Sequence, residues 1–374
     1  MKIENVELHQ VELPFLHPFE SSRGTIFNKT CIIISVHSEG ITGYGECSAE
    51  AGPWYSDETV VTAWHILGEF LIPQVIGQDI NSIKEAVQKF SPIRGNRMAK
   101  AGIENAFWDL FAKAGSVSLS NMMGGVRDKI PVGVSIGIQP SLDKLLEVVE
   151  NYLADGYRRI KLKIKPGWDI DVIRAVRERW EDLLLQVDAN CAYTMEQIQI
   201  FMELDQFNLL LIEEPLNSED LSEHSKLQGF IKTPVCLDES IYSFEQAKLA
   251  LKLNACKVIN IKPGRVGGFT SAIKIHDLCK EKGIPVWCGG MYETNIGRAG
   301  NVALASLSNF TLPGDISASS RYFKEDIAIP DFVLNCDSTL TVPSNPGIGV
   351  DMEYNKLLQY RVKNQSFLNK KFTY

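Results

Sequence analysis

The segment IKLKIKPG, residues 160–167, alternates between apolar and basic residues. Alternation with a period of two is typical of a β-strand, so Lys161, Lys163 and Lys165 are predicted to share one face of a strand whose other face is apolar. Such a strand is either a solvated cationic edge strand or part of a functional site. The segments on either side of it decide between these two interpretations.

Short apolar runs followed by helical segments recur throughout the middle of the chain. This alternation is typical of a parallel sheet with crossover helices, and eight repeats predict an α/β fold, a (β/α)8 TIM-type barrel. The eight predicted strands are IPVGVSIGI (130–138), RRIKLKIK (158–165), DLLLQVDAN (182–190), LLLIEEP (209–215), TPVCLDES (233–240), KVINIKPG (257–264), IPVWCGG (284–290) and FTLPGDIS (310–317).

The beginning and the end of the chain have a different pattern. Residues 1–50 alternate like short antiparallel strands, and residues 57–115 read as amphipathic helices, which together predict an α+β domain. We therefore predict an N-terminal capping domain over residues 1–125 and a catalytic barrel over residues 126–325. A C-terminal segment, residues 326–374, is expected to pack back on the capping domain.

Composition excludes several classes of protein. The 374 residues are 45% hydrophobic and 22% charged, as in an ordinary soluble globular protein, and a net charge of −8 argues against a nucleic-acid partner. Eight cysteines without a CxxC pair indicate a reducing compartment, and neither a targeting segment nor a membrane span is apparent, so we expect a cytoplasmic protein. The motif GRVGG lacks the GxGxxG spacing of a dinucleotide site, and no organic cofactor is expected.

Five charged residues recur at an almost constant interval near the ends of consecutive predicted strands. Each is 24 or 25 positions after the one before it, which is one βα unit. Because the carboxyl ends of barrel strands meet at one mouth, we expect all five side chains at the same rim. They are Lys163, Asp188, Glu213, Asp238 and Lys262.

The three acids of this set predict a metal site. Converging carboxylates repel one another unless a cation lies between them, and oxygen-only ligands suit Mg²⁺, with Mn²⁺ as the alternative. A single acidic strand end is more simply a helix cap or a surface charge, but three in matching positions favour a metal. The predicted ligands are Asp188, Glu213 and Asp238, with Asn190, Glu214 and Glu239 as supporting hydrogen-bonding residues.

The lysines are predicted to be acid–base groups on the two sides of a bound substrate. Lys161 is expected to lower the pKa of Lys163, the predicted proton acceptor, and Arg265 to lower the pKa of Lys262 in the same way. Lys262 lies across the mouth because strands two and six are four apart in a ring of eight. A hard cation between two amines suits removal of a proton α to a carboxylate.

Motifs along nearly the whole chain resemble a known family. KLK (161–163), QVDAN (186–190), LIEEP (211–215), CLDES (236–240) and NIKPGRVGG (260–268) together resemble the muconate-lactonizing subgroup of the enolase superfamily. Within it, GPWYSDET (52–59), GGMYETNIGRAGN (289–301) and LPGDISAS (312–319) resemble the o-succinylbenzoate synthases and related N-succinylamino acid racemases. Dipeptide epimerases carry an Asp-x-Asp pair where this chain has Asp315, Ile316 and Ser317, so a dipeptide substrate is not expected.

The resemblance implies a small carboxylate substrate, 2-succinyl-6-hydroxy-2,4-cyclohexadiene-1-carboxylate, dehydrated in menaquinone biosynthesis. Lys163 would take the α-proton and then act as the acid of a syn elimination, while Lys262 would place positive charge over the anionic intermediate. The alternatives are an N-succinylamino acid racemase, in which both lysines exchange protons, a bifunctional enzyme, or a non-catalytic metabolite-binding barrel. A homo-oligomer is compatible with the resemblance.

The capping domain is expected to supply specificity as a lid over the mouth. The predicted lid loops are PFESSRGTIFNKT (18–30) and AEAGPWYSDE (49–58). For Trp54 and Tyr55 in the second loop, substrate contact and inter-domain packing are equally good interpretations. Ser135 is a candidate contact for the succinyl carboxylate. The other candidate substrate-binding or supporting residues are Gly290, Met291, Asp315 and Ser317.

Overall fold

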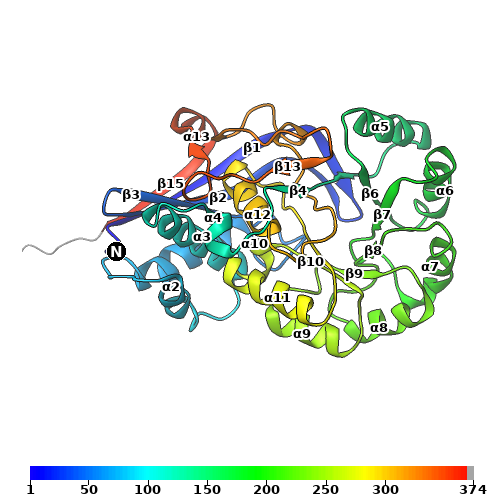
Figure 1. Ribbon diagram of the computed structural model, residues 1–374, viewed down its shortest axis with the longest axis horizontal. Helices are drawn as coiled ribbons and strands as arrows, with labels where there is room; N and C mark the ends of the chain where they lie inside the picture. The colour runs from blue at the N-terminus through cyan, green and yellow to red at the C-terminus, as the bar shows by residue number, and fades with distance from the viewer. Residues whose placement is uncertain (369–374) are drawn as a thin grey trace, which may run out of the picture.

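The structure, a computed structural model, describes residues 1–368. A barrel surrounded by helices lies beside an antiparallel sheet with its own helices (Figure 1). This confirms the predicted fold class, an enolase-like barrel with an α+β cap built from both ends of the chain. The boundaries predicted for the three domains remain a proposal.

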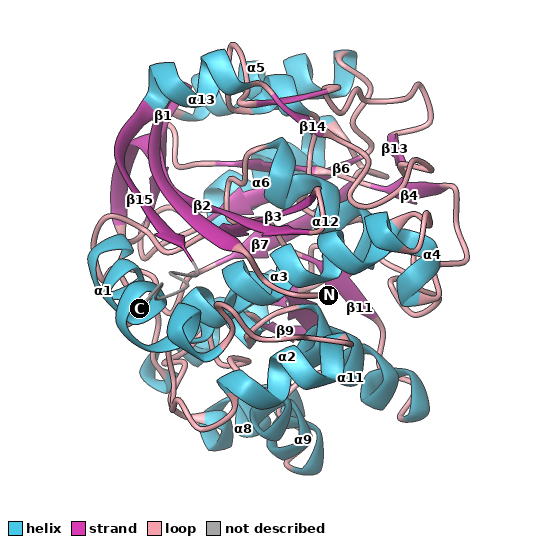
Figure 2. Ribbon diagram, turned by 90° about the vertical axis from the view of Figure 1, so that its left-hand side faces the viewer, coloured by secondary structure: helices cyan, strands magenta, loops and turns pink. Residues whose placement is uncertain are grey.

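The cap sheet is antiparallel and has the strand order β15-β1-β2-β3. The strands are β1 (Asn5–Ser21), β2 (Gly24–Ser38), β3 (Ile41–Cys47) and β15 (Arg361–Leu368). Helix α3 (Arg97–Ala114) packs on β3 and β2, as Figure 2 shows. The remaining helical segments of the cap are α1 (Val60–Ile66), a π-helical turn (Leu67–Leu71), a 3-10 turn (Ile72–Gln74), α2 (Ile83–Phe90) and α4 (Leu119–Met123).

The first two strands are much longer than the short strands predicted. They form one hairpin whose pairing continues to Ser21 and Gly24, after a break in register between Pro14 and Phe19. Proline has no N–H for the ladder, which accounts for a break at this point. The structure therefore corrects the prediction of a lid loop at residues 18–30, because these residues form the tip of the hairpin. The tip reaches the barrel (Figure 1), where the Ile138 N–H donates to the Glu20 carbonyl at 3.0 Å.

Seven parallel strands form the regular part of the barrel, adjacent in sequence order. They are β5 (Val134–Ile136), β6 (Arg159–Lys163), β7 (Leu184–Asp188), β8 (Ile212–Glu213), β9 (Val235–Leu237), β10 (Val258–Ile261) and β11 (Val286–Cys288). The helices between and after them are α5 (Leu142–Ala154), α6 (Ile170–Arg179), α7 (Ile198–Leu204) with a preceding 3-10 turn (Met195–Gln197), α8 (Leu221–Phe230), α9 (Phe244–Lys252), α10 (Pro263–Val266), α11 (Phe269–Glu281) and α12 (Asn295–Ala305). Serine caps begin several of them, as where the Ser141 side chain accepts from the Lys144 N–H.

The structure also corrects the eighth predicted strand, because residues 310–317 do not form a regular strand. Its backbone bonds to both neighbours, from the Asp315 N–H to Cys288 O at 2.9 Å and from the Gly133 N–H to Gly314 O at 2.9 Å, but it makes only isolated bridges. Pro313 within the segment has no N–H to donate, so a regular ladder cannot continue through it. The segment still closes the ring between the first and seventh strands.

The first predicted barrel strand, residues 130–138, is divided between two sheets. Strand β4 (Lys129–Pro131) pairs with β13 (Thr339–Thr341), and only β5 belongs to the barrel. The other elements of the C-terminal part are a 3-10 turn (Ser319–Arg321), β12 (Ala328–Ile329), β14 (Asp351–Met352) and α13 (Tyr354–Tyr360). Strand β12 pairs with β14, and β15 pairs with β1 in the cap.

The apolar core has three parts. One large cluster lies between the barrel strands and their helices and extends to part of the cap sheet, and a second lies between the cap sheet and its helices. A small third cluster fills the inside of the barrel with Leu211, Cys236, Val258 and Trp287. Because this cluster plugs the barrel, polar side chains nearer the carboxyl ends of the strands lie above a dry floor.

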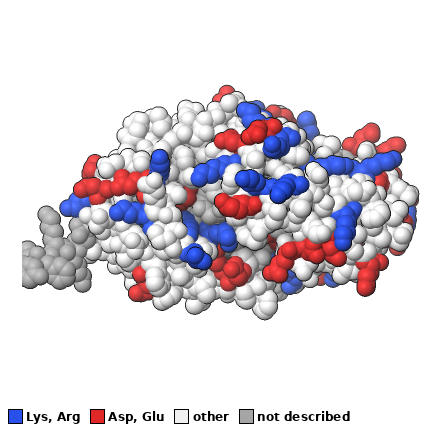
Figure 3. Space-filling view, turned by 90° about the horizontal axis from the view of Figure 1, so that it is seen from below, with Lys and Arg blue, Asp and Glu red and all other residues white. Residues whose placement is uncertain are grey.

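Acidic and basic side chains are mixed on the face seen in Figure 3, as the balanced composition of the chain leads one to expect. Among residues 1–368, no helix combines the length and the apolar character needed to cross a membrane.

Candidate active site

Strand β6 projects three basic residues toward the barrel interior. Arg159, Lys161 and Lys163 alternate with Ile160 and Leu162, and all five are buried. Ile160 and Leu162 point outward and pack in the large apolar cluster, so the three basic side chains point inward.

Lys165 was expected on the same cationic face, and the structure corrects this. The strand ends at Lys163, and the Lys165 ammonium lies at the surface, 3.5 Å from Glu20 of the hairpin tip.

The three rim acids lie on three adjacent strands, completely or almost completely buried. Asp188 and Glu213 are direct partners in the β7–β8 register, whereas Glu213 is opposite Cys236 in β9. Asp238 lies two residues beyond Cys236, so it occupies the same inward face one level closer to the mouth. The exposed fraction of each of the three acids is 1% or less.

Two lysines from β6 neutralise the acids on one side of the barrel. The Lys161 Nζ atom lies 3.1 Å from Asp188, 2.9 Å from Glu213 and 2.5 Å from Asp315. The Lys163 Nζ atom donates to Asp188 Oδ2 and to Asn190 Oδ1, each at 2.6 Å. Lys161 is thus surrounded by three carboxylates, whereas Lys163 contacts one carboxylate and one amide.

The opposite side of the barrel has a second cationic cluster around Asp238. Lys262 Nζ lies 2.8 Å from Asp238 Oδ2, and the Arg265 guanidinium contacts Asp238 Oδ1. Tyr55 of the cap joins this cluster: its hydroxyl donates to Asp238 at 3.2 Å and accepts from Lys262 at 3.1 Å and from Arg265 at 3.0 Å. A cap residue therefore closes onto the rim directly.

The two β6 lysines have pKa shifts of opposite sign. Burial lowers the pKa of Lys163, and the Lys161 charge lowers it further, against the attraction of Asp188. Burial acts on Lys161 in the same direction, but Asp315, Glu213 and Asp188 together raise its pKa well above the ordinary value. The prediction that Lys161 lowers the pKa of Lys163 has the correct sign.

The predicted effect on Lys262 is wrong. Burial acts to lower the pKa of Lys262, but Tyr55, Glu239 and Glu213 outweigh it and raise the pKa. Arg265 does not reverse this, because its guanidinium is occupied by Asp238, by the Tyr55 hydroxyl and by backbone carbonyls.

The acids also differ among themselves. Burial, followed by the charge of Asp188, raises the pKa of Glu213 to about 7. Burial opposes ionisation of Asp188 as well, but Lys163 and Lys161 dominate and lower its pKa. Negative charge at Glu213 is therefore only partly compensated by the lysines.

The arrangement of the acids bears on the predicted metal site. Among residues 1–368, no group of three or more His, Cys, Asp and Glu side chains is arranged so that it could hold a metal ion. The donors nevertheless fit a hard divalent ion in type, because Asp188, Glu213 and Asp238 are buried oxygen ligands on neighbouring strands. In this arrangement the Lys161 ammonium lies between Asp188 and Glu213, and it would have to give up these contacts to an ion.

Two of the predicted supporting residues contact rim acids directly, since the Asn190 N–H donates to Asp188 and Glu214 accepts from the Asp238 N–H, and Glu239 is linked to them through Asn190. Asn190 links Lys163 to Glu239, whose Oε1 accepts from the Asn190 amide at 2.8 Å and whose Oε2 is buried without a partner. Glu214 accepts from the Asp238 N–H at 2.6 Å. Asn190 and Glu214 have positive φ angles of 45° and 35°, which bend the chain just after the strands.

A small cavity of about 30 Å³, here called the mouth cavity, lies above these groups. Both Lys163 and Lys262 line it, and the three acids lie beneath. The predicted residues that line it are Tyr55, Ser135, Lys161, Lys163, Lys262, Gly290, Met291 and Asp315. Position 289, beside the mouth cavity, requires glycine. A Cβ there would lie only 2.7 Å from Lys262 Cε.

Trp54 and Ser317, two further predicted residues, do not line the mouth cavity. Trp54 is 70% exposed on the cap surface, so neither inter-domain packing nor contact with the mouth cavity describes its position. Ser317 is buried, and its hydroxyl donates to the Gly133 carbonyl at 2.9 Å, which ties the irregular eighth segment to the first strand.

Several residues of the site were not singled out by the sequence patterns. The same period of two that selects Lys161 and Lys163 also places Arg159 inward, and it places Asn260 inward two residues before Lys262. Arg159 binds Asp315 at 2.5 Å, and the Asn260 amide binds Glu213 at 2.9 Å. The mouth cavity is also lined by residues that were not singled out individually, namely Phe19, Arg23 and Glu50 from the two predicted lid segments, and Tyr292 and Tyr322.

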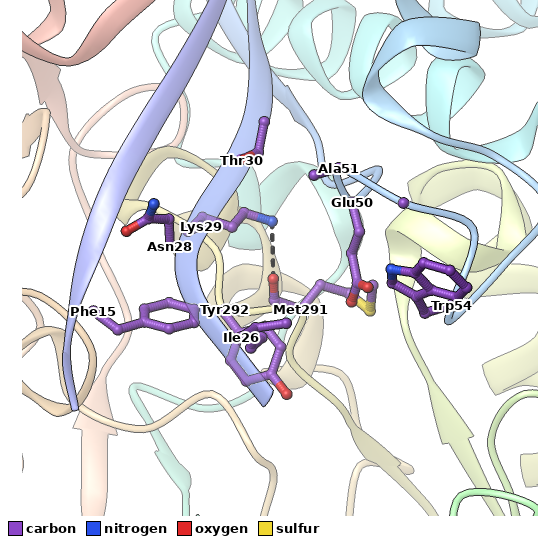
Figure 4. Close-up of a pocket in the computed structure, with 11 residues that line it drawn as sticks. Phe15, Ile26, Asn28, Lys29, Thr30, Glu50, Ala51, Trp54, Met291 and Tyr292 are labelled. Atoms are coloured by element: carbon purple, nitrogen blue, oxygen red, sulfur yellow. Dashed lines mark hydrogen bonds between the residues drawn. The ribbon is translucent and has the colours of Figure 1, made fainter. Parts of the chain in front are cut away.

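A second pocket of about 100 Å³ adjoins the mouth cavity on the cap side and shares Glu50, Met291 and Tyr292 with it (Figure 4). Trp54 lies at one side of this pocket and Phe15 at the other. The Lys29 ammonium donates to the Met291 carbonyl at 2.9 Å, which joins the cap strand to the barrel.

The fold and this site define a class of protein. A family model described as mandelate racemase / muconate lactonizing enzyme, N-terminal domain, matches residues 4–124, and one described as enolase C-terminal domain-like matches residues 144–356. The chain therefore belongs to the enolase superfamily.

Individual relatives are similar over almost the entire chain. An o-succinylbenzoate synthase from Geobacillus kaustophilus is 49% identical over 96% of this chain and 96% of its own length. An N-succinylamino acid racemase from Amycolatopsis is 49% identical over 94% of this chain and 95% of its own length. A crystal structure of an enolase-superfamily member from Listeria innocua has a TM-score of 0.95 at 44% identity and covers 98% of this chain and 99% of that one.

Proposed function

We propose that the protein is an o-succinylbenzoate synthase, a hydro-lyase of menaquinone biosynthesis. It converts 2-succinyl-6-hydroxy-2,4-cyclohexadiene-1-carboxylate into 2-succinylbenzoate and water. The observation that carries the proposal is the pair of lysines, Lys163 and Lys262, which come from opposite sides of the barrel and line one cavity above buried acids. The similarity to synthases over nearly the whole chain supports the choice of substrate.

Lys163 is the proposed base and acid. Its neutral amine takes the proton from the ring carbon that carries the carboxylate, and the electron pair of that C–H bond moves onto the carboxylate as an enediolate. The same ammonium then gives its proton to the 6-hydroxyl, the C–O bond breaks, and water leaves as the ring becomes aromatic. One group serves both steps if the proton and the hydroxyl are on the same face, which is a syn elimination.

Lys262 is proposed to act through its charge on the other face of the substrate. Its ammonium, held by Asp238 and the Tyr55 hydroxyl, would stabilise the doubly negative enediolate as it develops. Ser135 also lines the mouth cavity with a hydroxyl that lacks a hydrogen-bond partner, which supports its proposed contact with substrate.

We propose that Asp188, Glu213 and Asp238 hold Mg²⁺, with Mn²⁺ as the alternative. A divalent ion at these residues would neutralise negative charge on the substrate carboxylate. Glu214 and Arg265 would keep Asp238 in place through the contacts described above, and Asn190, linked to Glu239, would hold Lys163 beside Asp188.

Racemisation of N-succinylamino acids is the second candidate reaction. A lysine on each face of one cavity is the arrangement that a two-base racemase needs, because one amine removes the α-proton and the other delivers a proton from the opposite side. The similarity to a racemase at 49% identity favours testing both reactions on the same protein.

The deciding experiment measures aromatisation of the cyclohexadiene substrate by ultraviolet absorbance, beside polarimetry and solvent-deuterium exchange with N-succinylamino acids. We expect Lys163→Ala to lower aromatisation by roughly 100- to 10,000-fold, the usual contribution of a general base. Lys165→Ala, at the solvated ion pair with Glu20, is the matched control and should retain activity. A wild-type protein that neither aromatises, racemises nor exchanges would be a non-catalytic binder, and the proposal would be wrong.

Metal dependence is tested separately. Chelation with EDTA should abolish activity, and added Mg²⁺ should restore it and raise the melting temperature. Full activity after exhaustive chelation would contradict the metal proposal.

We also propose a cytoplasmic location. This is supported by eight cysteines that are all free, six of them buried, as suits a reducing compartment. A homo-oligomer is likewise a proposal, which sedimentation velocity would test.

A further inference from the structure

Arg321 is a cation held in a fixed position beside the mouth cavity. It ends the 3-10 turn Ser319–Arg321, and its guanidinium carbon lies 5.0 Å from the ring centroids of Tyr152 and Tyr322 and 5.9 Å from that of Phe19. Its Nη2 atom donates to the Ser135 carbonyl at 3.0 Å. Aromatic faces and one carbonyl therefore orient the guanidinium without neutralising it.

The charge of Arg321 has no counterion. Among residues 1–368 it forms no ion pair, and its Nε atom is buried without a hydrogen-bond partner. Two buried arginines are satisfied differently, since Arg159 pairs with Asp315, and Arg298 donates to three backbone carbonyls. Arg23 at the mouth cavity resembles Arg321 more closely, because among residues 1–368 it also forms no ion pair and its Nε atom is buried without a partner. A partly buried guanidinium with free donors is suited to bind a carboxylate in two-point fashion.

Arg321 faces an open hollow of about 440 Å³. His17, Lys144 and Asp155 contribute the other ionisable side chains of its wall, but Lys144 pairs with Glu147, and Asp155 makes no ion pair with Arg321. Phe19 lines both this hollow and the mouth cavity. Ser135 connects the two, because its carbonyl accepts from Arg321 while its unpartnered hydroxyl lies at the mouth cavity.

We infer that Arg321 binds a carboxylate in this hollow, and that this is the distal carboxylate of a succinylated substrate reaching from the mouth cavity past Phe19. The inference rests on the proposed function for the identity of the substrate. A free dicarboxylate such as succinate has the same chemistry and is the other source of such a group. The experiment below distinguishes the two.

The first test compares substrates with and without the distal carboxylate. KM is measured for an N-succinylamino acid and for the N-acetyl derivative of the same amino acid, in wild type and in Arg321→Gln. We expect the substitution to raise KM for the succinyl substrate at least tenfold and to change KM for the acetyl substrate less than twofold, with partial rescue in Arg321→Lys. Equal losses on both substrates would mean that Arg321 only supports Ser135 and would overturn the inference.

Arg179 offers a matched control. It also lies over an aromatic ring, Trp180, at 4.9 Å, but on the outer surface of the barrel and paired with Glu150. Arg179→Gln should leave both KM values unchanged.

The second test measures binding of succinate itself by calorimetry, which does not depend on activity. Wild type should bind succinate and Arg321→Gln should not. If succinate binding depends on Arg321 while the preference for succinyl over acetyl substrates does not, the carboxylate site is supported, but its ligand is a separate dicarboxylate. No dependence of either measurement on Arg321 overturns the site. A wild type without any activity but with Arg321-dependent succinate binding would refute the proposed function and leave the site supported.

Discussion

At the scale of single residues, neighbouring charges determine what each rim lysine can do. Lys161 and Lys163 are two positions apart on the same strand face, yet their pKa values shift in opposite directions. The difference comes from the number of carboxylates in contact, three for Lys161 and one for Lys163. Lys161 is thereby kept as a permanent cation beside a lysine suited to accept a proton.

Tyr55 offers a test of how the cap contributes to the site. Replacing it by phenylalanine removes three hydrogen bonds, to Asp238, Lys262 and Arg265, while the ring remains beneath Arg23 at 4.7 Å. Hydrogen bonds to charged groups contribute roughly 1.5 to 3 kcal/mol, so we expect kcat/KM to fall about 10- to 100-fold. Tyr354→Phe on α13 is the control, because among residues 1–368 the Tyr354 hydroxyl bonds only to Tyr44. A loss below twofold in Tyr55→Phe would refute this role.

Asp326 should make stability depend on pH. Burial, against hydrogen bonds from backbone N–H groups, raises the pKa of its carboxyl from 3.8 to about 6. At this group the folded protein binds more protons than the unfolded chain between these values, so the contribution of Asp326 to stability is fully present below about pH 4 and is lost as pH rises through about 6. A shift of this size corresponds to a loss of about 3 kcal/mol.

Urea unfolding from pH 4 to 7 tests this in wild type and in Asp326→Asn. The difference in unfolding free energy between the two proteins should change across this range in favour of the variant, because asparagine does not titrate. Parallel pH profiles would contradict the assignment.

At the scale of elements, the β1–β2 hairpin belongs to both parts of the molecule. Its base forms the centre of the cap sheet, and its tip supplies Phe19 and Arg23 to the mouth cavity. The Ser22 hydroxyl at the tip donates to the Ala189 carbonyl at 3.2 Å, beside the rim residue Asp188. The wall of the mouth cavity and the centre of the cap sheet are thus formed by one continuous element.

Contact between β3 and α3 depends on glycine. A Cβ at Gly45 would lie 2.1 Å from the Gly102 carbonyl oxygen and 2.6 Å from the Ala106 nitrogen, both backbone atoms. Gly45→Ala should therefore lower the unfolding free energy by about 1 to 3 kcal/mol or more, as overpacking does.

Gly229 in α8 is the matched control, because a Cβ there has no neighbour within 4 Å. Gly229→Ala should stabilise by about 0.5 to 1 kcal/mol through helix propensity. Chemical denaturation measures both variants. Equal effects of the two substitutions would show that close packing at β3 is not responsible.

At the scale of the whole molecule, a buried ion pair joins the cap to the barrel. Lys29 of β2 lies 3.4 Å from Glu46 of β3, and both are buried. Lys29 also donates to the Met291 carbonyl, while Glu46 accepts from the Thr294 hydroxyl at 2.7 Å, so both partners reach the loop after β11. The pair therefore holds the mouth cavity between the two parts.

Lys29→Met tests this joint. It leaves the Glu46 carboxylate buried without its cation, for which we expect a loss of about 3 to 5 kcal/mol in unfolding free energy. The double variant Lys29→Met/Glu46→Gln removes both charges and should recover part of this loss. If the double variant is less stable by the sum of both single effects, the two residues do not act as a pair.

Local pattern was sufficient for much of the fold and for the candidate rim residues. Alternation with a period of two places Lys161 and Lys163 inward, and the repeat of 24 or 25 residues identifies five consecutive strand ends, because both are properties of the chain over short distances. The same rules placed Lys165 on the inward face and predicted a regular eighth strand, and both predictions were wrong. Alternation does not show where a strand ends, and it does not show that Pro313 interrupts the hydrogen-bond ladder of the eighth segment.

The sequence by itself determined the succession of βα units and the kinds of side chain at the rim. Periodicity depends only on residues close together in the chain, and the chemistry of a side chain depends only on its own identity. Only the tertiary structure decided which carboxylate each ammonium meets and that Tyr55 contacts Asp238 and Lys262. It also decided that Arg321 faces a hollow, without a counterion among residues 1–368. These features depend on distances between segments far apart in the chain. Electrostatic energy follows those distances, and no local pattern contains them.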